Sequence, residues 1–191
     1  SRLIHEFIRG FRAGSGRELL VFRGEAAASH QAPYELFTGP LSRLLSETGL
    51  ADRVFRAGDG AQRLRPVVEY LAGHREADER LRSLEPSALR LEIHLSLRFV
   101  LERLSSLAEE EGRAPLVVYL DSLQCADHAS IEAIDFLASN LGDAGPILFL
   151  WTYRPEFELK PEWRSSLPVR EIELKPLPES GCARILQSVL E

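Results

Sequence analysis

The 191-residue sequence contains no methionine and only two cysteines, and it has no long apolar run. Cys125 and Cys182 have no His or Cys at ligand spacing, which argues against a disulfide framework and against a zinc site. No stretch approaches the roughly 20 apolar residues of a membrane span, and the start carries no secretory signal pattern. These absences predict a cytoplasmic protein that makes no contact with a membrane.

The charge balance lacks a basic excess, since 23 basic and 29 acidic residues give a net charge of −6. A nucleic-acid backbone requires a broad basic face, so direct binding of nucleic acid is not expected. The hydrophobic content of 45% is sufficient for a substantial core in one main domain. Because methionine is missing and the sequence opens within a helical pattern, "SRLIHEF", we expect a piece of a longer protein.

The order of apolar patterns predicts an α/β fold. Apolar runs typical of buried parallel strands alternate with amphipathic segments, which favours a parallel sheet with helices on both faces. Strands are expected at 18–23, 115–121, 145–156 and 169–174, and helices at 2–12, at several places within 40–112, at 128–142 and near the end of the chain.

The stretch "PLVVYLDSLQCAD" places a charge where a buried strand ends. Five apolar residues run from Leu116 to Leu120 and stop at Asp121 and Ser122. Ligands of open α/β sheets bind just beyond the carboxyl ends of the strands. Asp121 is therefore a candidate ligand of a metal or substrate.

Three stretches carry a resemblance to a known family: "LVVYLDSLQCADHASIEAIDFLA", "PILFLWTYRPEF" and "IELKPLPESGCARIL". In this order they resemble the core of a P-loop ATPase of the STAND branch, close to the AAA superfamily, as found in bacterial multidomain signalling and transcriptional regulators. The resemblance implies a three-layer αβα fold with a largely helical insertion, here 40–112, between the second and third core strands. It assigns 1–175 to a truncated core and 176–191 to the start of a helical lid.

The same resemblance implies a part that the sequence lacks. "SRLIHEF" is similar to the residues that follow the lysine of the phosphate loop (Walker A), so Ser1 would be the hydroxyl that ligates Mg²⁺. The glycines and the lysine of that loop are not in this sequence. Without their N–H groups and charge, this chain alone is expected to bind ATP weakly or not at all. ATP and Mg²⁺ are expected as cofactors of the parent protein.

Asp121 and Ser122 occupy the two positions that are acidic in this family. Asp121 is expected to hold Mg²⁺, and the alternative is a carboxylate that caps the next helix or pairs with an arginine. Ser122 stands in place of the acid that orients or deprotonates the attacking water, and serine is no general base near neutral pH without an activator. Hydrolysis is then slow or absent, unless an acid such as Asp127 substitutes. Asp127 also suits the N-cap of the following helix.

Thr152 and Arg154 match the sensor position of the family, at the end of the neighbouring strand. A hydroxyl and a guanidinium there are expected to reach the γ-phosphate, since arginine binds phosphate through two N–H groups at once. The alternative for Arg154 is a salt bridge to Glu156 or Asp121. Tyr34 follows the strand expected at 18–23 and would either line the nucleotide pocket or belong to a solvent loop.

The sequence leaves two functions open. One is an ATP-binding regulatory module whose partners are the nucleotide and the other domains of its parent protein, and a homo-oligomer is compatible with it. The other is a non-catalytic α/β scaffold or protein-interaction domain of the same ancestry. Fold analogy does not decide between them, because function depends on the site.

Overall fold

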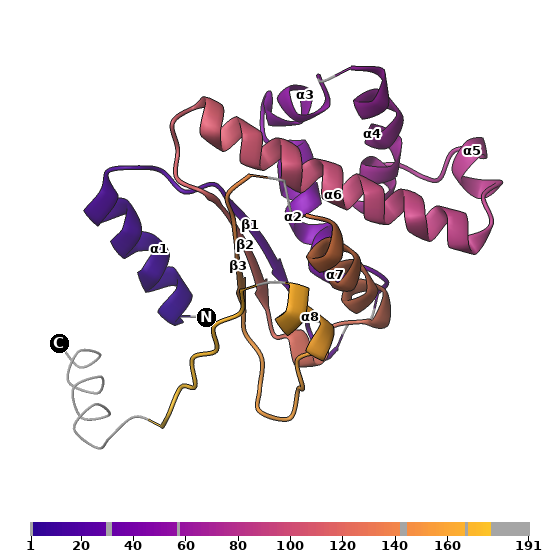
Figure 1. Cartoon of the computed structure of the whole chain (residues 1–191). Coiled ribbons are helices and arrows are strands. Elements are labelled where there is room, and N and C mark those ends of the chain that lie inside the picture. The colour runs from indigo at the N-terminus through magenta and orange to yellow at the C-terminus, as the bar shows by residue number, and fades with distance from the viewer. Residues whose placement is uncertain (1, 30–31, 57, 142–144, 167, 177–191) are drawn as a thin grey trace.

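The computed structural model describes residues 2–29, 32–56, 58–141, 145–166 and 168–176, and it has an α/β fold (Figure 1). The strands are β1 (Val21–Glu25), β2 (Leu116–Asp121) and β3 (Ile147–Trp151). The helices are α1 (Arg2–Ser15), α2 (Glu35–Ser46), α3 (Leu50–Phe55), α4 (Asp59–Leu71), α5 (Glu79–Arg82), α6 (Pro86–Glu110), the 3-10 turn η1 (Leu123–Cys125), α7 (His128–Asn140) and α8 (Pro161–Ser166). Ser1, Cys182 and most of the expected lid (177–191) lie outside the described residues.

The three strands form one parallel sheet in the order β1-β2-β3, which confirms the expected parallel arrangement. Every residue of the middle strand, β2, is buried. Its alternate residues Leu116, Val118 and Leu120 belong to the hydrophobic core, while Val117 and Tyr119 point to the opposite face of the sheet. The long helical stretch expected within 40–112 lies between β1 and β2.

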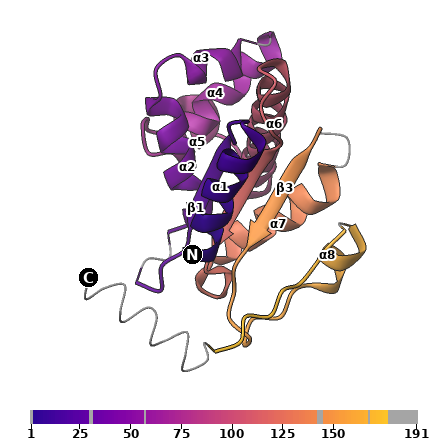
Figure 2. The same cartoon turned by 90° about the vertical axis from the view of Figure 1, so that its left-hand side faces the viewer.

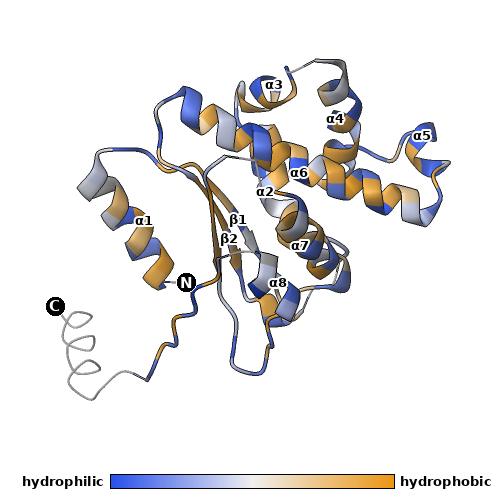
Figure 3. Ribbon diagram, viewed as in Figure 1, coloured by the Kyte–Doolittle hydropathy of each residue, from blue (hydrophilic) through white to orange (hydrophobic). Residues whose placement is uncertain are grey.

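The two faces of the sheet are covered differently. Helices α2, α6 and α7 lie on one side, and α1 lies on the other (Figure 1). From the side of α1, β3 is visible beside that helix (Figure 2). Hydrophobic residues follow the strands and alternate with polar residues along the helices (Figure 3). On α1 the apolar stripe is only partly covered, since Leu3 is 54% exposed and Phe7 is 41% exposed.

Helix α6 is the longest element of the core. Pro86 starts it at a position where the missing N–H costs no hydrogen bond. Ile93, Leu97 and Leu101 lie on its buried stripe, as the sequence predicts. Gly112 (φ 65°) ends it, because a left-handed residue lets the Arg113 N–H bond back to the Ala108 carbonyl at 2.8 Å. Within the described part, every helix is too short or too polar to span a bilayer.

Four expected elements differ in the structure. The strand expected at 18–23 lies at Val21–Glu25, and the strand expected at 145–156 covers only Ile147–Trp151. The segment 169–174 forms no strand among the described residues, and Ile172 is 73% exposed. A strand requires a neighbour for its backbone groups, and the described chain places none beside this segment. The helical stretch expected to start at residue 40 begins earlier, since α2 starts at Glu35, because a distant side chain binds its first N–H groups.

Candidate functional site at the carboxyl ends of the strands

Asp121 and Thr152 meet at the carboxyl ends of β2 and β3. Asp121 is 6% exposed, and its Oδ1 accepts a hydrogen bond from the Thr152 hydroxyl. Thr152 is fixed by its own backbone, since its N–H donates to the Leu120 carbonyl at 3.1 Å and its carbonyl accepts from the Leu123 N–H at 2.9 Å. The structure thus brings together two residues that the sequence placed at one site.

Ser122 has an unusual backbone conformation beside this pair. Its φ of 64° and ψ of 48° lie in the left-handed region, which residues other than glycine rarely adopt. The Ser122 N–H donates to the Thr152 Oγ1 at 3.1 Å, which holds the turn in place. Among the described residues, Tyr34 (φ 62°) is the other non-glycine residue with positive φ, and it also follows the carboxyl end of a strand. Such outliers gather at functional sites, where the surroundings hold them.

Arg154 is exposed at the same edge of the sheet. Its backbone N–H donates to Gln124 Oε1 at 3.2 Å, which ties the segment after β3 to the turn after β2. In the described part of the chain, its guanidinium forms no ion pair with Asp121 or Glu156. The guanidinium therefore remains available to a ligand beyond the strand ends.

Tyr119 is a neighbour of Asp121 that the sequence did not single out. It lies two residues earlier on the same face of β2 and is fully buried, and its hydroxyl has no hydrogen-bond partner among the described residues. Burial raises the pKa of Tyr119, and the neighbouring Asp121 carboxylate raises it further through its hydrogen-bonding reach and its charge, so the phenol stays protonated. The Arg23 guanidinium covers its ring, 5.6 Å from the centroid. Side chains two residues apart on a strand lie on the same face, and this rule would have identified Tyr119 as a neighbour of Asp121.

Asp127 joins the loops that follow β1 and β2. Its carboxylate accepts the Tyr34 N–H at 3.0 Å and the Glu35 N–H at 3.1 Å, and it also accepts the N–H of Ser130 at 2.9 Å. It therefore caps both α2 and α7, which confirms the N-cap role. Burial alone would raise the pKa of Asp127, but the hydrogen bonds from Ser130, Tyr34 and Glu35 hold that pKa below its ordinary value. The Ser130 hydroxyl is a fourth donor, at 2.5 Å, and a carboxylate with four donors is poorly placed to act as a base.

The strand-end residues fit Mg²⁺ only in part. Within the described residues no group of three or more His, Cys, Asp or Glu side chains is placed to hold a metal. Asp121 offers one buried carboxylate, and Mg²⁺ in nucleotide sites commonly takes one or two carboxylates, with water and phosphate oxygens as its other ligands. The donor set is compatible with a nucleotide-bound Mg²⁺ and too small for a site made of protein groups alone.

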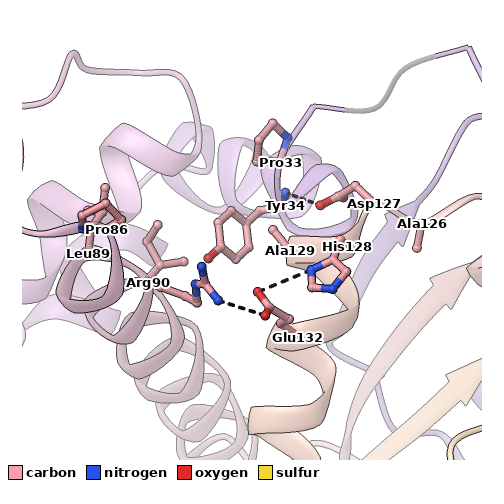
Figure 4. Close-up of a pocket in the computed structure, with 11 residues that line it drawn as sticks. Pro33, Tyr34, Pro86, Leu89, Arg90, Ala126, Asp127, His128, Ala129 and Glu132 are labelled. Atoms are coloured by element: carbon pink, nitrogen blue, oxygen red, sulfur yellow. Dashed lines mark hydrogen bonds and ion pairs between the residues drawn. The ribbon is translucent and has the colours of Figure 1, made fainter.

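A separate hollow lies between α6, α7 and the start of α2 (Figure 4). Its volume is about 580 Å³, and Tyr34 forms part of its wall. Arg90 of α6 and Glu132 of α7 bridge one side of it, with 2.9 Å between Nη1 and Oε1. Tyr34 is thus buried in a wall and does not belong to a solvent loop.

His94 is a buried titratable residue next to this hollow. It is 7% exposed, and its Nε2 has no hydrogen-bond partner among the described residues. Its ring packs between Tyr34, at 6.1 Å, and Phe136, at 5.2 Å between centroids. Burial lowers the pKa of His94, while Glu132 opposes this shift and Arg90 adds to it.

Acid is expected to destabilise the domain through His94. Between its lowered pKa and the ordinary value of 6.5, the folded chain holds fewer protons than the unfolded chain. Stability is therefore full above pH 6.5 and falls as the pH drops below it, by about 1.4 kcal/mol for each unit of pKa difference. Urea unfolding at about pH 7.5 and about pH 5.5 should show a smaller loss for His94→Leu than for the wild type. An equal loss of stability in the wild type and in His94→Leu would show that His94 does not cause the acid sensitivity. His128→Leu, at a side chain 87% exposed, is the matched control and should follow the wild type.

Comparisons of the chain with protein-family models, curated proteins and solved structures found no match. The established description is therefore an α/β domain with a three-stranded parallel sheet.

Proposed function

We propose that this chain is the core of an ATP-binding regulatory module of a larger bacterial signalling or transcriptional protein, with weak or absent hydrolysis. In this proposal it is a STAND/AAA-like P-loop ATPase domain of three αβα layers, and ATP and Mg²⁺ are its cofactors. The observation that carries the proposal is Asp121, a buried carboxylate at the carboxyl end of the middle strand, bonded to Thr152 from the next strand end. Ligands of open parallel sheets bind at this edge.

Each residue of the strand-end group has a part in this proposal. Asp121 would ligate Mg²⁺, and Thr152 would hold the carboxylate in position through its hydroxyl. Arg154 would pair with a phosphate, since its guanidinium is exposed at the same edge. Ser1, a second Mg²⁺ ligand by resemblance, lies outside the described residues. When bound, Mg²⁺ would neutralise phosphate charge.

Weak or absent hydrolysis follows from the groups next to Asp121. Ser122 cannot take a proton from water near neutral pH, and its N–H already serves Thr152. Asp127, the acid that would replace it, has its carboxylate occupied by the caps of α2 and α7. The site is better suited to binding a nucleotide and responding to it than to turnover.

A non-catalytic scaffold is the second candidate. The hydrogen bonds at the strand ends favour it, because Thr152 already donates to one oxygen of Asp121 and accepts from the N–H of Ser122. In that case the Asp121–Thr152 pair only joins β2 to β3. The two proposals differ in whether Asp121 changes nucleotide affinity.

Titration of the full-length protein with ATP and Mg²⁺ distinguishes the two. Asp121→Ala should weaken binding by at least about tenfold, equivalent to 1.4 kcal/mol, because it removes the protein carboxylate that would ligate the metal. Asp52→Ala removes an acid whose side chain is 66% exposed and should leave the affinity unchanged. Equal affinities for wild type and Asp121→Ala would favour the scaffold.

A further inference from the structure

The hollow between α6, α7 and the start of α2 has the size and lining of a small-molecule site. Ligand pockets commonly enclose about 300–1,000 Å³ and combine apolar walls with a few polar groups. The volume here is about 580 Å³, and the apolar wall includes Pro33, Pro86, Leu89 and Ile93. Figure 4 shows the ring of Tyr34 at the back of the hollow, between α6 and α7.

Three polar side chains of this hollow, those of Tyr34, Arg90 and His128, can donate hydrogen bonds. The Arg90 guanidinium has five N–H groups, and Glu132 is the one acceptor bonded to it in the described part of the chain. The Tyr34 hydroxyl lies near this guanidinium, whose charge opposes the rise that burial causes in the pKa of Tyr34. His128, on the opposite wall, lies 3.7 Å from Glu132. The ligand should therefore bring an acceptor.

The two acids of the hollow limit the charge of that acceptor. Asp127 is occupied by N–H groups at the starts of α2 and α7, and Glu132 accepts from Arg90 at 2.9 Å, with His128 Nδ1 3.7 Å from its other oxygen. Neither carboxylate is left to bind a cation by itself. A dianion such as phosphate would face both acids with one guanidinium to compensate, so a monoanion fits better.

We propose that this hollow binds the carboxylate of a small amphipathic acid, with the carboxylate on Arg90 and the apolar body against Tyr34, Leu89 and Ile93. The bond from Arg90 to Glu132 would be kept, because a second N–H edge of the guanidinium remains for the ligand. This site is separate from the strand-end group and does not depend on nucleotide binding.

Titration with 4-phenylbutyrate tests the proposal, and backbone amide chemical shifts report the binding. Shifts at Ala129 and Glu132 should saturate, with a Kd below about 1 mM for a ligand of this size. The amine and alcohol of the same carbon skeleton should bind at least about tenfold more weakly, since they lack the carboxylate. The affinities of acetyl-Leu-Phe and of its C-terminal amide are compared with that of 4-phenylbutyrate. Tighter binding of acetyl-Leu-Phe than of 4-phenylbutyrate would point to the carboxylate of a peptide end, and weaker binding to a free acid.

Variants identify the groups involved. Arg90→Met should weaken binding of 4-phenylbutyrate by at least about tenfold. Arg82→Met, at a guanidinium whose side chain is 64% exposed on α5, is the control and should bind like the wild type. Ala129→Leu should fill the hollow and weaken the binding of 4-phenylbutyrate and of the corresponding amine and alcohol. No saturable shift at Ala129 and Glu132, tighter binding of the amine, or undiminished binding by a folded Arg90→Met protein would each overturn the proposal.

Discussion

Replacing Gly24 by alanine should unfold the domain or destabilise it by more than about 3 kcal/mol, a loss typical of severe overpacking. A Cβ at this position of β1 would lie 1.9 Å from the carbonyl oxygen of Leu36 and 2.9 Å from its carbonyl carbon. Both are backbone atoms of α2, so no side-chain rotation relieves the clash. Helix α2 would have to move away from the sheet, together with the buried residues Leu36 and Phe37.

The close approach at Gly24 has a cause in the sequence of α2. Pro40 lies inside this helix and has no N–H, so it cannot bond the Leu36 carbonyl four residues earlier. That carbonyl instead points at the position where Gly24 carries only a hydrogen.

Urea unfolding compares Gly24→Ala with Gly10→Ala. Gly10 lies within α1, and a Cβ there would meet no atom within 4 Å. Its replacement should leave stability unchanged or raise it by up to about 1 kcal/mol through helix propensity. Equal unfolding midpoints for the two variants would show that α2 does not press on β1 at Gly24.

Asp127→Ala should lower the free energy of unfolding by about 3 kcal/mol, because one carboxylate caps two helices. The variant removes the acceptor for the N–H groups of Tyr34 and Glu35 in α2 and for that of Ser130 in α7. It also releases the left-handed conformation of Tyr34, which these bonds hold. Asp127→Asn keeps one acceptor oxygen and should lie between alanine and wild type.

Asp78→Ala is the matched control for a cap of one helix. Asp78 accepts the Leu81 N–H at 2.9 Å at the start of α5 and, within the described residues, caps no other helix. Its loss should cost about 1 kcal/mol. If Asp127→Ala costs no more than Asp78→Ala, the contacts from Asp127 to α2 contribute nothing to stability.

Local pattern was sufficient for much of the fold and for part of the site. The apolar run 116–120 gave a fully buried strand, because a strand buried on both faces leaves no room for polar residues. The meeting of Asp121 and Thr152 follows from parallel strands, whose carboxyl ends lie at one edge of a sheet. The apolar stripe on α6 was predictable because apolar residues that recur with the helical period of 3.6 residues lie on one face of a helix.

Contacts between distant parts of the chain were not predictable from pattern. The start of α2 at Glu35 depends on Asp127, 92 residues away, and not on its own sequence. Ser122 has a positive φ and donates its N–H to Thr152, 30 residues away, and a serine in a turn carries no signal for either. The segment 169–174 alternates like a strand, but alternation specifies a face and does not supply a neighbouring strand.

The proposed function is tested most directly by the Mg²⁺ dependence of ATP affinity in the full-length protein. ATP affinity is measured with Mg²⁺ and with EDTA, for the wild type and for Asp121→Asn, which keeps an acceptor for Thr152 but removes the charge. The proposal predicts that Mg²⁺ tightens ATP binding at least about tenfold in the wild type and about threefold or less in Asp121→Asn. The same gain from Mg²⁺ in both proteins, or no ATP binding by either, would contradict it.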